Sequence, residues 1–264
     1  MLRVAILGVG KLGESIAEGL LAAGTAGVLY LVERSEERRK EAARKYRATV
    51  SVDPIAACKF SEVIILAVKP TDLLELCRTI APILTPKKIV ISAAAGIVLP
   101  RIKEALGGHE AVARVMPNIA ASSNSAVAGV YSDNELAKTM SMKIFGDLGV
   151  CYDCLNDFEI DQFTGLTASG PGFVAEFLNC LQMAAEELGV KNSNEIVRQM
   201  AIGTIKVIDS GKESMAEFVA RVKTPGGTTA AGLELFEKYG MRQMMREALE
   251  ASIKRAGELD KEYS

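Results

Sequence analysis

Residues 4–13 read Val-Ala-Ile-Leu-Gly-Val-Gly-Lys-Leu-Gly, an apolar run that passes directly into three spaced glycines. This spacing is the G-x-G-x-x-G fingerprint of dinucleotide binding, in which a strand precedes the glycines and a helix follows them. Gly8 allows a tight turn, Gly10 lets a pyrophosphate approach the backbone, and Gly13 permits close packing of helix on strand. The predicted cofactor-binding residues of this loop are Gly8, Gly10, Lys11, Leu12 and Gly13. The alternative is a glycine-rich turn in another α/β protein, such as a methyltransferase.

An acidic residue follows at the expected distance. Glu33 stands twenty residues after Gly13, at the end of a second apolar run, where a carboxylate accepts hydrogen bonds from the adenosine ribose. By that rule Glu33 favours NAD. Arg34 comes next, followed by further basic residues that are able to clamp a 2′-phosphate instead. The sequence therefore predicts a nicotinamide cofactor and leaves NADH or NADPH open.

Strand-like and helix-like segments alternate through the first 156 residues. The predicted strands cover residues 4–7, 28–32, 63–68, 89–92, 112–116 and 127–131. Helices are predicted from Leu12 to a stop at Gly24, from a cap at Ser35, and near 72–80, 99–106 and 133–148. Near-continuous apolar strands alternating with helices indicate a mostly parallel sheet covered on both faces, a Rossmann-type doubly wound α/β domain.

After residue 156 the strand patterns end, and apolar residues recur at helical spacing. We therefore predict two domains, a dinucleotide-binding domain over 1–156 and an all-α domain over 157–264. The helical part has more apolar positions than about 105 residues need for a core. Some of them are expected to face a second subunit, which predicts a homo-oligomer, either a dimer or an assembly of dimers.

Composition excludes several classes of protein. The 31 Lys and Arg against 33 Asp and Glu give a net charge of −2, so no basic surface for nucleic acid is expected. No window approaches the roughly 18 consecutive apolar residues of a membrane span. The 5 cysteines do not resemble a secreted disulfide framework, and 1–10 resembles a strand rather than a signal peptide. We expect reduced thiols and a cytoplasmic protein without membrane or nucleic-acid partners.

The sequence contains one histidine, so few sites that depend on histidine are possible. The single histidine, His109, follows Gly107 and Gly108 in what looks like a surface turn. Histidine triads and two-histidine zinc sites are therefore excluded. Cys151 and Cys154 have redox or metal spacing, but in a strand they point to opposite faces, so we assign them to packing and predict no metal site.

Loops after the later strands complete the predicted cofactor crevice, because ligands of open α/β sheets bind beyond the carboxyl ends of the strands. The residues chosen there are Ala67, Val68, Lys69, Pro70, Ala95, Gly96, Met116, Pro117 and Asn118.

Two stretches of the helical part resemble anion-binding helix starts. They are Thr167–Pro171, with Ser169 as the cap, and Thr224–Thr229, with two glycines and three hydroxyl side chains. Free N–H groups at a helix N-terminus hold a carboxylate without a charged side chain.

These motifs, in this order and on this length, resemble the pyrroline-5-carboxylate reductase family essentially end to end. The quoted elements are Gly8–Gly13, Ala67–Pro70, Ser92–Gly96, Arg114–Asn118, Ser169–Pro171 and, as the most specific, Pro225–Thr229. The resemblance implies reduction of a cyclic imine carboxylate, 1-pyrroline-5-carboxylate, to L-proline with NADPH or NADH, by subunits whose helical domains interlock. We choose Thr229 and Ser169 as the catalytic polar contacts. We place the substrate carboxylate on Thr224, Gly226, Gly227 and Thr228, and the proton donor is not assigned.

Several positions depart from the family pattern. Ile119 and Ala120 follow Met-Pro-Asn where the family has Thr or a similar residue and then Pro. Ala168 and Gly172 replace the usual glycine and alanine around Ser-Gly-Pro, and Lys223 replaces a small hydroxyl residue. Lys223 either points to solvent or binds a second anionic group on a different substrate.

Rival functions remain. One is a reductase of a related cyclic imine. Another is a β-hydroxyacid dehydrogenase, which normally needs a lysine on the interdomain helix, whereas 169–187 contains none. The last is a non-catalytic dinucleotide-binding protein.

Overall fold

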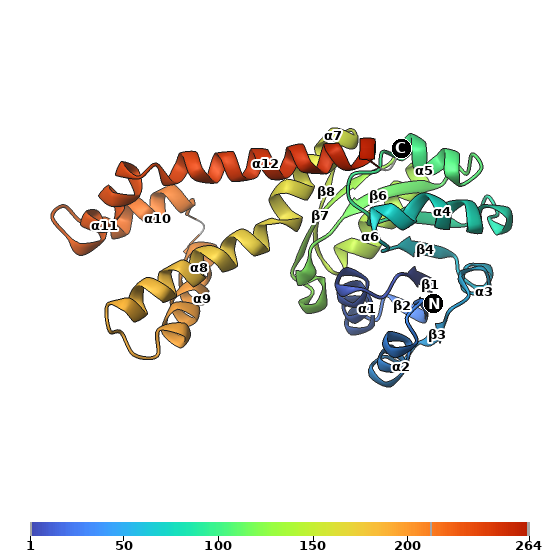
Figure 1. The fold of residues 1–264 in the computed structure, drawn as a ribbon, viewed down its shortest axis with the longest axis horizontal. Helices are drawn as coiled ribbons and strands as arrows, with labels where there is room; N and C mark the ends of the chain where they lie inside the picture. The colour runs from blue at the N-terminus through green and yellow to red at the C-terminus, as the bar shows by residue number, and fades with distance from the viewer. Residues whose placement is uncertain (1, 212, 263–264) are drawn as a thin grey trace. The chain divides into compact units, whose positions relative to one another are not determined.

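The structure is a computed structural model that describes residues 2–211 and 213–262, and its elements are labelled in Figure 1. The strands are β1 (Leu2–Leu7), β2 (Ala26–Val32), β3 (Thr49–Ser51), β4 (Val63–Leu66), β5 (Ile89–Ser92), β6 (Val112–Met116), β7 (Ala126–Tyr131) and β8 (Gly149–Asp153). The first helices are α1 (Lys11–Ala23), α2 (Glu36–Lys45), α3 (Pro54–Phe60), α4 (Pro70–Ile80), α5 (Leu99–Ala105), α6 (Glu135–Gly146) and α7 (Asp157–Phe163). The later helices are α8 (Gly170–Glu187), α9 (Ser193–Gly211), α10 (Met215–Val222), α11 (Thr228–Lys238) and α12 (Met241–Glu262). Short 3₁₀ turns cover Ala81–Ile83 and Ile119–Ser123, and a π-helical segment covers Thr164–Ala168.

The strands form a sheet in the order β3-β2-β1-β4-β5-β6-β7-β8. Among the described strands, neighbours run parallel except β6 and β7. The chain leaves β1 toward β2 and β3 on one side and returns to β4 on the other, so the strand order reverses between β1 and β4. Such a switch point is where doubly wound sheets bind ligands. The predicted Rossmann-type sheet is thus confirmed.

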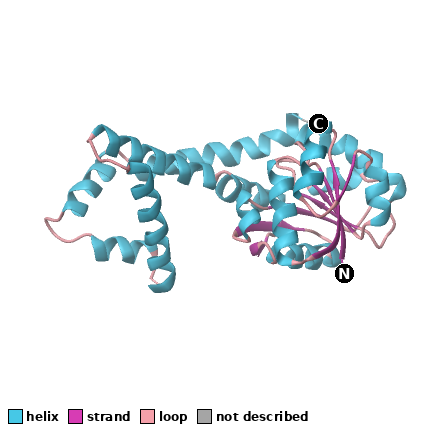
Figure 2. Ribbon diagram, turned by 90° about the horizontal axis from the view of Figure 1, so that it is seen from below, coloured by secondary structure: helices cyan, strands magenta, loops and turns pink. Residues whose placement is uncertain are grey.

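Helices cover both faces of this sheet (Figure 2). The side chains of β1, which alternate between the two faces, show why this cover is needed. Val4 and Ile6 belong to one buried cluster, which includes Ile16 and Leu20 of α1. Ala5 and Leu7 point the other way, into a cluster with apolar residues of α4 and α5. Because successive side chains of a strand point to opposite faces, an all-apolar strand needs cover on both sides.

Local signals in the first part behave as predicted. Gly24 ends α1 in the left-handed conformation, with φ of 68°, and its N–H bonds back to the helix. Ser35 caps α2 by accepting a hydrogen bond from the N–H of Arg38. β3 and α3 were not predicted, and β8 was expected only through the strand packing assigned to Cys151 and Cys154. They have three, seven and five residues, too few for a clear periodicity.

The chain divides into two compact units whose boundaries differ from the predicted ones. The first unit contains the residues up to Ser169 together with those from Ala251 onward, and the second is Gly170–Glu250. The predicted boundary after residue 156 thus separates segments that pack together. A Cβ on Gly165 would lie 2.4 Å from Cγ1 of Ile253, so the π-helical segment packs tightly on the last turns of α12.

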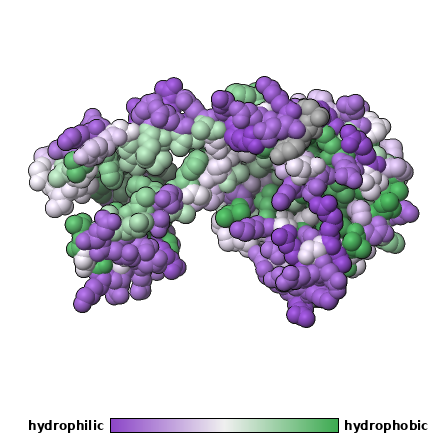
Figure 3. All heavy atoms as spheres, viewed as in Figure 1, coloured by the Kyte–Doolittle hydropathy of each residue, from purple (hydrophilic) through white to green (hydrophobic). Residues whose placement is uncertain are grey.

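The second unit has little interior of its own. Among its described residues, the buried apolar side chains are those of Val197 and Ala230. Large apolar side chains of α8 to α11 are exposed instead, and they are seen as green atoms in Figure 3. They include Val174, Leu181, Met183, Ile196, Met200, Ile202, Ile205, Val207, Val219, Leu235 and Phe236. An isolated unit that exposes so many apolar residues lacks the burial that stabilises a helical domain.

Candidate functional site

The three glycines after β1 meet three different requirements. Gly8 has φ of 100°, and a Cβ there would lie 2.7 Å from the carbonyl oxygen of Ala67. A Cβ on Gly13 would lie 2.0 Å from the carbonyl oxygen of Gly8, so α1 packs directly on the turn. A Cβ on Gly10 would meet no described atom within 4 Å, and Gly10 has φ of −86°. Gly8 and Gly13 are therefore required by the fold itself, whereas Gly10 faces open space at the start of α1, as a phosphate site requires.

Glu33 braces this turn. One carboxylate oxygen accepts the N–H of Val9 at 3.2 Å, and the other accepts the N–H of Ser35 at 2.9 Å. The carboxylate thereby ties the glycine turn to the end of β2. Its position beside the turn agrees with the predicted ribose contact and fixes the acid before any ligand is bound.

A cleft of about 630 Å³ opens at the switch point between β1 and β4. The predicted residues that line it are Gly8, Gly10, Glu33, Arg34, Ala67, Val68 and Lys69. The structure thus brings together the glycine turn, the end of β2 and the end of β4, which are far apart in sequence. Further apolar side chains of the lining are those of Leu7, Val32, Val52, Pro54 and Leu76. The volume of the cleft is in the range of small-molecule binding sites.

Sequence reasoning missed one wall of this cleft. Asp72, Glu75, Leu76 and Thr79 of α4 line it, and they recur at i, i+3, i+4 and i+7. That spacing places them on one face of a helix. The helix itself was predicted near 72–80, so the pattern was available. Arg38 also lines the cleft.

The remaining predicted cofactor residues do not line the cleft. Lys11, Leu12 and Gly13 form the first turn of α1, and Pro70 begins α4. Ala95 and Gly96 follow β5, and Met116, Pro117 and Asn118 end or follow β6, at the same edge of the sheet.

Gly96 and Asn118, in the loops after β5 and β6, each have a role in the fold itself. A Cβ on Gly96 would lie 2.4 Å from Cβ of Leu259, so close packing of α12 is sufficient to require glycine there. The side chain of Asn118 caps the following turn by accepting the N–H of Ala120.

The predicted helix start at Thr224–Thr229 is confirmed. Gly226 has φ of 72° after Pro225, and the N–H of Gly227 donates to the carbonyl of Thr224 at 3.0 Å, as in a type II turn. Gly227 is the N-cap of α11, and a Cβ on it would lie 2.3 Å from Oγ1 of Thr224. The N–H of Gly227 is therefore used inside the turn, which corrects its predicted role as a carboxylate donor. The N–H groups of the first turn, including those of Thr228 and Thr229, have no intrahelical acceptor.

The second predicted helix start is confirmed in part: α8 begins at Gly170 with Pro171 in its first turn, but Ser169 does not act as its N-cap. The chain runs from α7 through the π-helical segment to α8 without a break in right-handed helical backbone, and Ser169 itself has φ of −85° and ψ of −28°. Its N–H donates to the carbonyl of Thr164 at 3.2 Å, so it is not free for an anion. The Ser169 hydroxyl lies 2.9 Å from Oγ of Ser252 in α12, a partner that no local pattern predicts.

Arg114 of β6 is the most buried charged side chain near these loops. It is 1% exposed and pairs with Asp157 at 2.5 Å and with Asp161 at 3.2 Å, both on α7. Its Nε has no partner among the described atoms. Burial raises the pKa of Asp161, and the Arg114 guanidinium opposes that shift. Since a buried charge is costly without its partner, the pairs fix α7 against the strand that leads to Met116.

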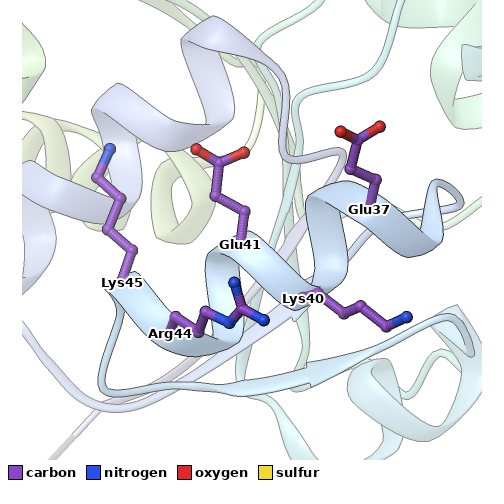
Figure 4. Close-up of a pocket in the computed structure, with 5 residues that line it drawn as sticks. All are labelled: Glu37, Lys40, Glu41, Arg44 and Lys45. Atoms are coloured by element: carbon purple, nitrogen blue, oxygen red, sulfur yellow. The ribbon is translucent and has the colours of Figure 1, made fainter.

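Three further features lie outside this cleft. A hollow of about 500 Å³ along α2 is lined by Glu37, Lys40, Glu41, Arg44 and Lys45, side chains of one solvated helix (Figure 4). His109 shares a hydrogen bond with the carbonyl of Lys88 at 2.8 Å. Within 2–211 and 213–262, no helix is both long and apolar enough to cross a membrane.

Known proteins resemble both parts of the chain. Residues 3–96 match the family described as NADP oxidoreductase coenzyme F420-dependent, and residues 158–259 match the family described as pyrroline-5-carboxylate reductase dimerisation. A pyrroline-5-carboxylate reductase from Pseudomonas aeruginosa is 27% identical over 263 residues, which cover 97% of this chain and 96% of that protein.

Solved structures agree with this likeness. The pyrroline-5-carboxylate reductase of Coxiella burnetii has a TM-score of 0.87 at 26% identity and covers 98% of both chains. The pyrroline carboxylate reductase of Plasmodium falciparum, solved with NADP bound, has a TM-score of 0.87 at 22% identity, again over 98% of both chains. At 22% identity, the second likeness concerns the fold alone.

Proposed function

The chain belongs to the pyrroline-5-carboxylate reductase family, and we propose that it reduces 1-pyrroline-5-carboxylate to L-proline with NADPH or NADH. It is an oxidoreductase that acts on a C=N bond. The observation that carries the proposal is the cleft at the switch point, with Gly10 open to it, on a chain that aligns over nearly its whole length with reductases of this name.

The cleft fits a dinucleotide on its own geometry. Gly10 leaves space for a pyrophosphate at the N-terminus of α1, where N–H groups and the helix dipole favour an anion. Glu33 and Arg34 would hold the adenosine ribose, and the backbone of Ala67 to Pro70 would run along the other side. Ala95, Gly96, Met116, Pro117 and Asn118 would flank the nicotinamide end. When bound, the reduced nicotinamide supplies a hydride to the imine carbon.

We place the substrate carboxylate at the start of α11. The type II turn from Thr224 to Gly227 leads into α11, where the N–H groups of Thr228 and Thr229 have no intrahelical acceptor, and the N–H of Gly226 stays a predicted donor. The helix dipole favours an anion there, so no charged side chain is required. The Thr229 hydroxyl is assigned to the ring, and the Ser169 hydroxyl, held by Ser252, is assigned as a second polar contact.

The chemistry suits this inventory of residues. Hydride addition to a C=N bond needs one proton on nitrogen and no strong base, and the ring nitrogen is itself basic. The chain's contribution is therefore mainly positioning of the ring, which for well-oriented groups supplies about 7–11 kcal/mol of the barrier. No histidine is required for such a reaction.

A second copy of the chain is part of the proposal. The exposed apolar side chains of α8 to α11 would pack against the same helices of a partner in a two-fold interface. The cytoplasmic location expected from the cysteine content stays a prediction.

The test is a panel assay with the purified protein. Loss of the reduced nicotinamide's absorbance is followed with 1-pyrroline-5-carboxylate and with a six-membered cyclic imine carboxylate, using each reduced cofactor, and proline is identified as the product. A β-hydroxyacid is tested in the opposite direction, with each oxidised cofactor and a gain of the same absorbance. Reduction of the five-membered imine with the highest kcat/KM supports the proposal. Preference for the larger ring would point to Lys223 and Ala120 as marks of another substrate. If no imine leads to oxidation of NADPH or NADH, the proposed function is refuted.

A further inference from the structure

The basic side chains after β2 differ in what they already bind. Arg39 donates to the backbone carbonyl of Glu33 at 2.8 Å and to that of Arg34 at 2.6 Å. It is therefore committed to holding the backbone and is not available as a phosphate ligand. Arg38 is exposed, lines the cleft and forms no ion pair with the described residues. Arg34 lines the cleft as well, but its guanidinium is already paired.

The partner of Arg34 comes from the opposite wall. Its NH2 group donates to Oδ2 of Asp72 at 2.6 Å, across 38 residues of sequence. The Arg34 side chain is 79% exposed, whereas Asp72 is 32% exposed. Asp72 lies in the first turn of α4, where a negative charge is favoured by the helix dipole. The acid is thus the more buried member of the pair, at a position that favours its charge, and the arginine is the more exposed one.

This pair affects the two cofactor forms differently. A 2′-phosphate carries almost two negative charges and is bound best by guanidinium donors. While Asp72 holds Arg34, that guanidinium is less available to the phosphate, and Arg38 is the other basic side chain on this side of the cleft. A 2′-hydroxyl carries no charge and is a hydrogen-bond donor, which a carboxylate tolerates. Glu33 also favours a 2′-hydroxyl through its charge, but its two oxygens accept the N–H groups of Val9 and Ser35 and hold no arginine.

We propose that Asp72 determines cofactor preference, by holding Arg34 across the cleft and so disfavouring the 2′-phosphorylated cofactor relative to the 2′-hydroxyl form. The inference rests on the cofactor assignment made above and adds a specificity-determining residue to it. Only the tertiary structure identifies Asp72, because its pair with Arg34 joins α4 to the end of β2.

Binding of nucleotide fragments tests the proposal without the reaction. Adenosine 2′,5′-bisphosphate and adenosine 5′-monophosphate are titrated by calorimetry into the full chain and into the D72N variant. We expect D72N to bind the bisphosphate about tenfold more tightly, the size of one charge-assisted hydrogen bond from the freed Arg34 guanidinium to the phosphate, with the monophosphate changed less than twofold. The pair is exposed, so its loss leaves the unfolding midpoint nearly unchanged.

Glu75→Gln is the matched control. Glu75 lies one turn further along α4, lines the same cleft and loses the same charge, and no interaction of its side chain with the described residues is present. We expect its bisphosphate affinity to stay within about twofold of the parent. If E75Q and D72N gain the same affinity for the bisphosphate, the loss of one negative charge explains the gain without the Arg34–Asp72 pair, and the proposal fails.

Arg34→Ala completes a double-mutant cycle. In the R34A background the gain from D72N should fall below about twofold, because the proposed effect operates through the arginine. An undiminished gain, or unchanged bisphosphate affinity in D72N alone, overturns the proposal. If the parent chain binds neither fragment, the cofactor cleft is misassigned and this inference falls with it. Binding without imine reduction would refute the proposed reaction and leave the Asp72 assignment standing.

Discussion

Substitution of Gly10 by valine separates ligand binding from folding. Gly10 has φ of −86° and ψ of −171°, a conformation that any L-residue adopts, and a Cβ there meets no described atom within 4 Å. The protein itself therefore has room for the side chain. Valine is a poorer N-cap than glycine but loses less backbone entropy on folding, and these terms offset each other to within about 1 kcal/mol.

The ligand has no such room. The valine methyls would fill the space at the start of α1 where the pyrophosphate is placed, which removes one or two hydrogen bonds to a charged group. At about 1.5–3 kcal/mol each, the loss is about 1.5–6 kcal/mol, or roughly tenfold to ten-thousandfold in Kd. Titration of NADPH and NADH by calorimetry measures it, and thermal unfolding without ligand measures the fold.

Two other glycines serve as controls for Gly10→Val. Gly146 at the end of α6 also has open space around a Cβ and lies outside the cleft, so Gly146→Val should leave cofactor affinity unchanged. Gly13→Ala should destabilise the fold itself, since its Cβ would lie 2.0 Å from the Gly8 carbonyl. A folded Gly10→Val protein with the parent's affinity for both cofactors would falsify the placement of the pyrophosphate.

The remaining predictions concern the substrate, the subunit interface and the buried thiols. Thr229→Ala should reduce kcat/KM by about tenfold to a thousandfold with cofactor affinity barely changed, whereas Thr229→Ser, which keeps the hydroxyl, should retain most activity in steady-state assays. If Thr229→Ala matches the parent, the anion site lies elsewhere, and Lys223 becomes the first alternative. Ile205→Glu, at a side chain 58% exposed on α9, should shift sedimentation toward monomer, whereas Leu136→Glu on α6, 53% exposed, should not. A stable, active monomer of the parent chain would contradict the interface. Burial raises the pKa of Cys58 to about 12 from 9.0, so the folded chain keeps a proton that the unfolded chain loses, and stability falls as pH rises above about 9. Cys58→Ala should reduce this fall by about 1.4 kcal/mol per pH unit in urea unfolding, and an unchanged slope would contradict it.

Features that depend on neighbours in the sequence were predictable. Gly8 and Gly13 have the structural roles that their spacing predicts, Gly10 leaves the open space that its predicted role needs, and Gly24 and Ser35 end and begin helices as expected. The turn at Pro225–Gly226 and the start of α11 follow from the same local chemistry. In each case the deciding interactions lie within a few residues, so the pattern contains them.

Features that join distant segments were not predictable in this way. In the sequence Arg114 is a single polar residue within an apolar strand. In the structure it pairs with Asp157 and Asp161, which lie 43 and 47 residues further along the chain. Ser169 looked like a helix cap because Ser-Gly-Pro often begins a helix. In the structure Ser169 itself has helical backbone angles, and its hydroxyl lies 2.9 Å from Oγ of Ser252 in α12, a partner 83 residues away.

The sequence by itself determined the doubly wound sheet, the glycine turn, the acid at the end of β2 and the helical second part, because hydrophobic periodicity and turn chemistry are local. The tertiary structure alone decided which side chains share the cleft, that Arg34 pairs with Asp72 of α4, and that the last turns of α12 belong to the first unit. These depend on how packed surfaces match across tens to hundreds of residues. That matching is a property of the whole buried core, not of any short stretch of chain.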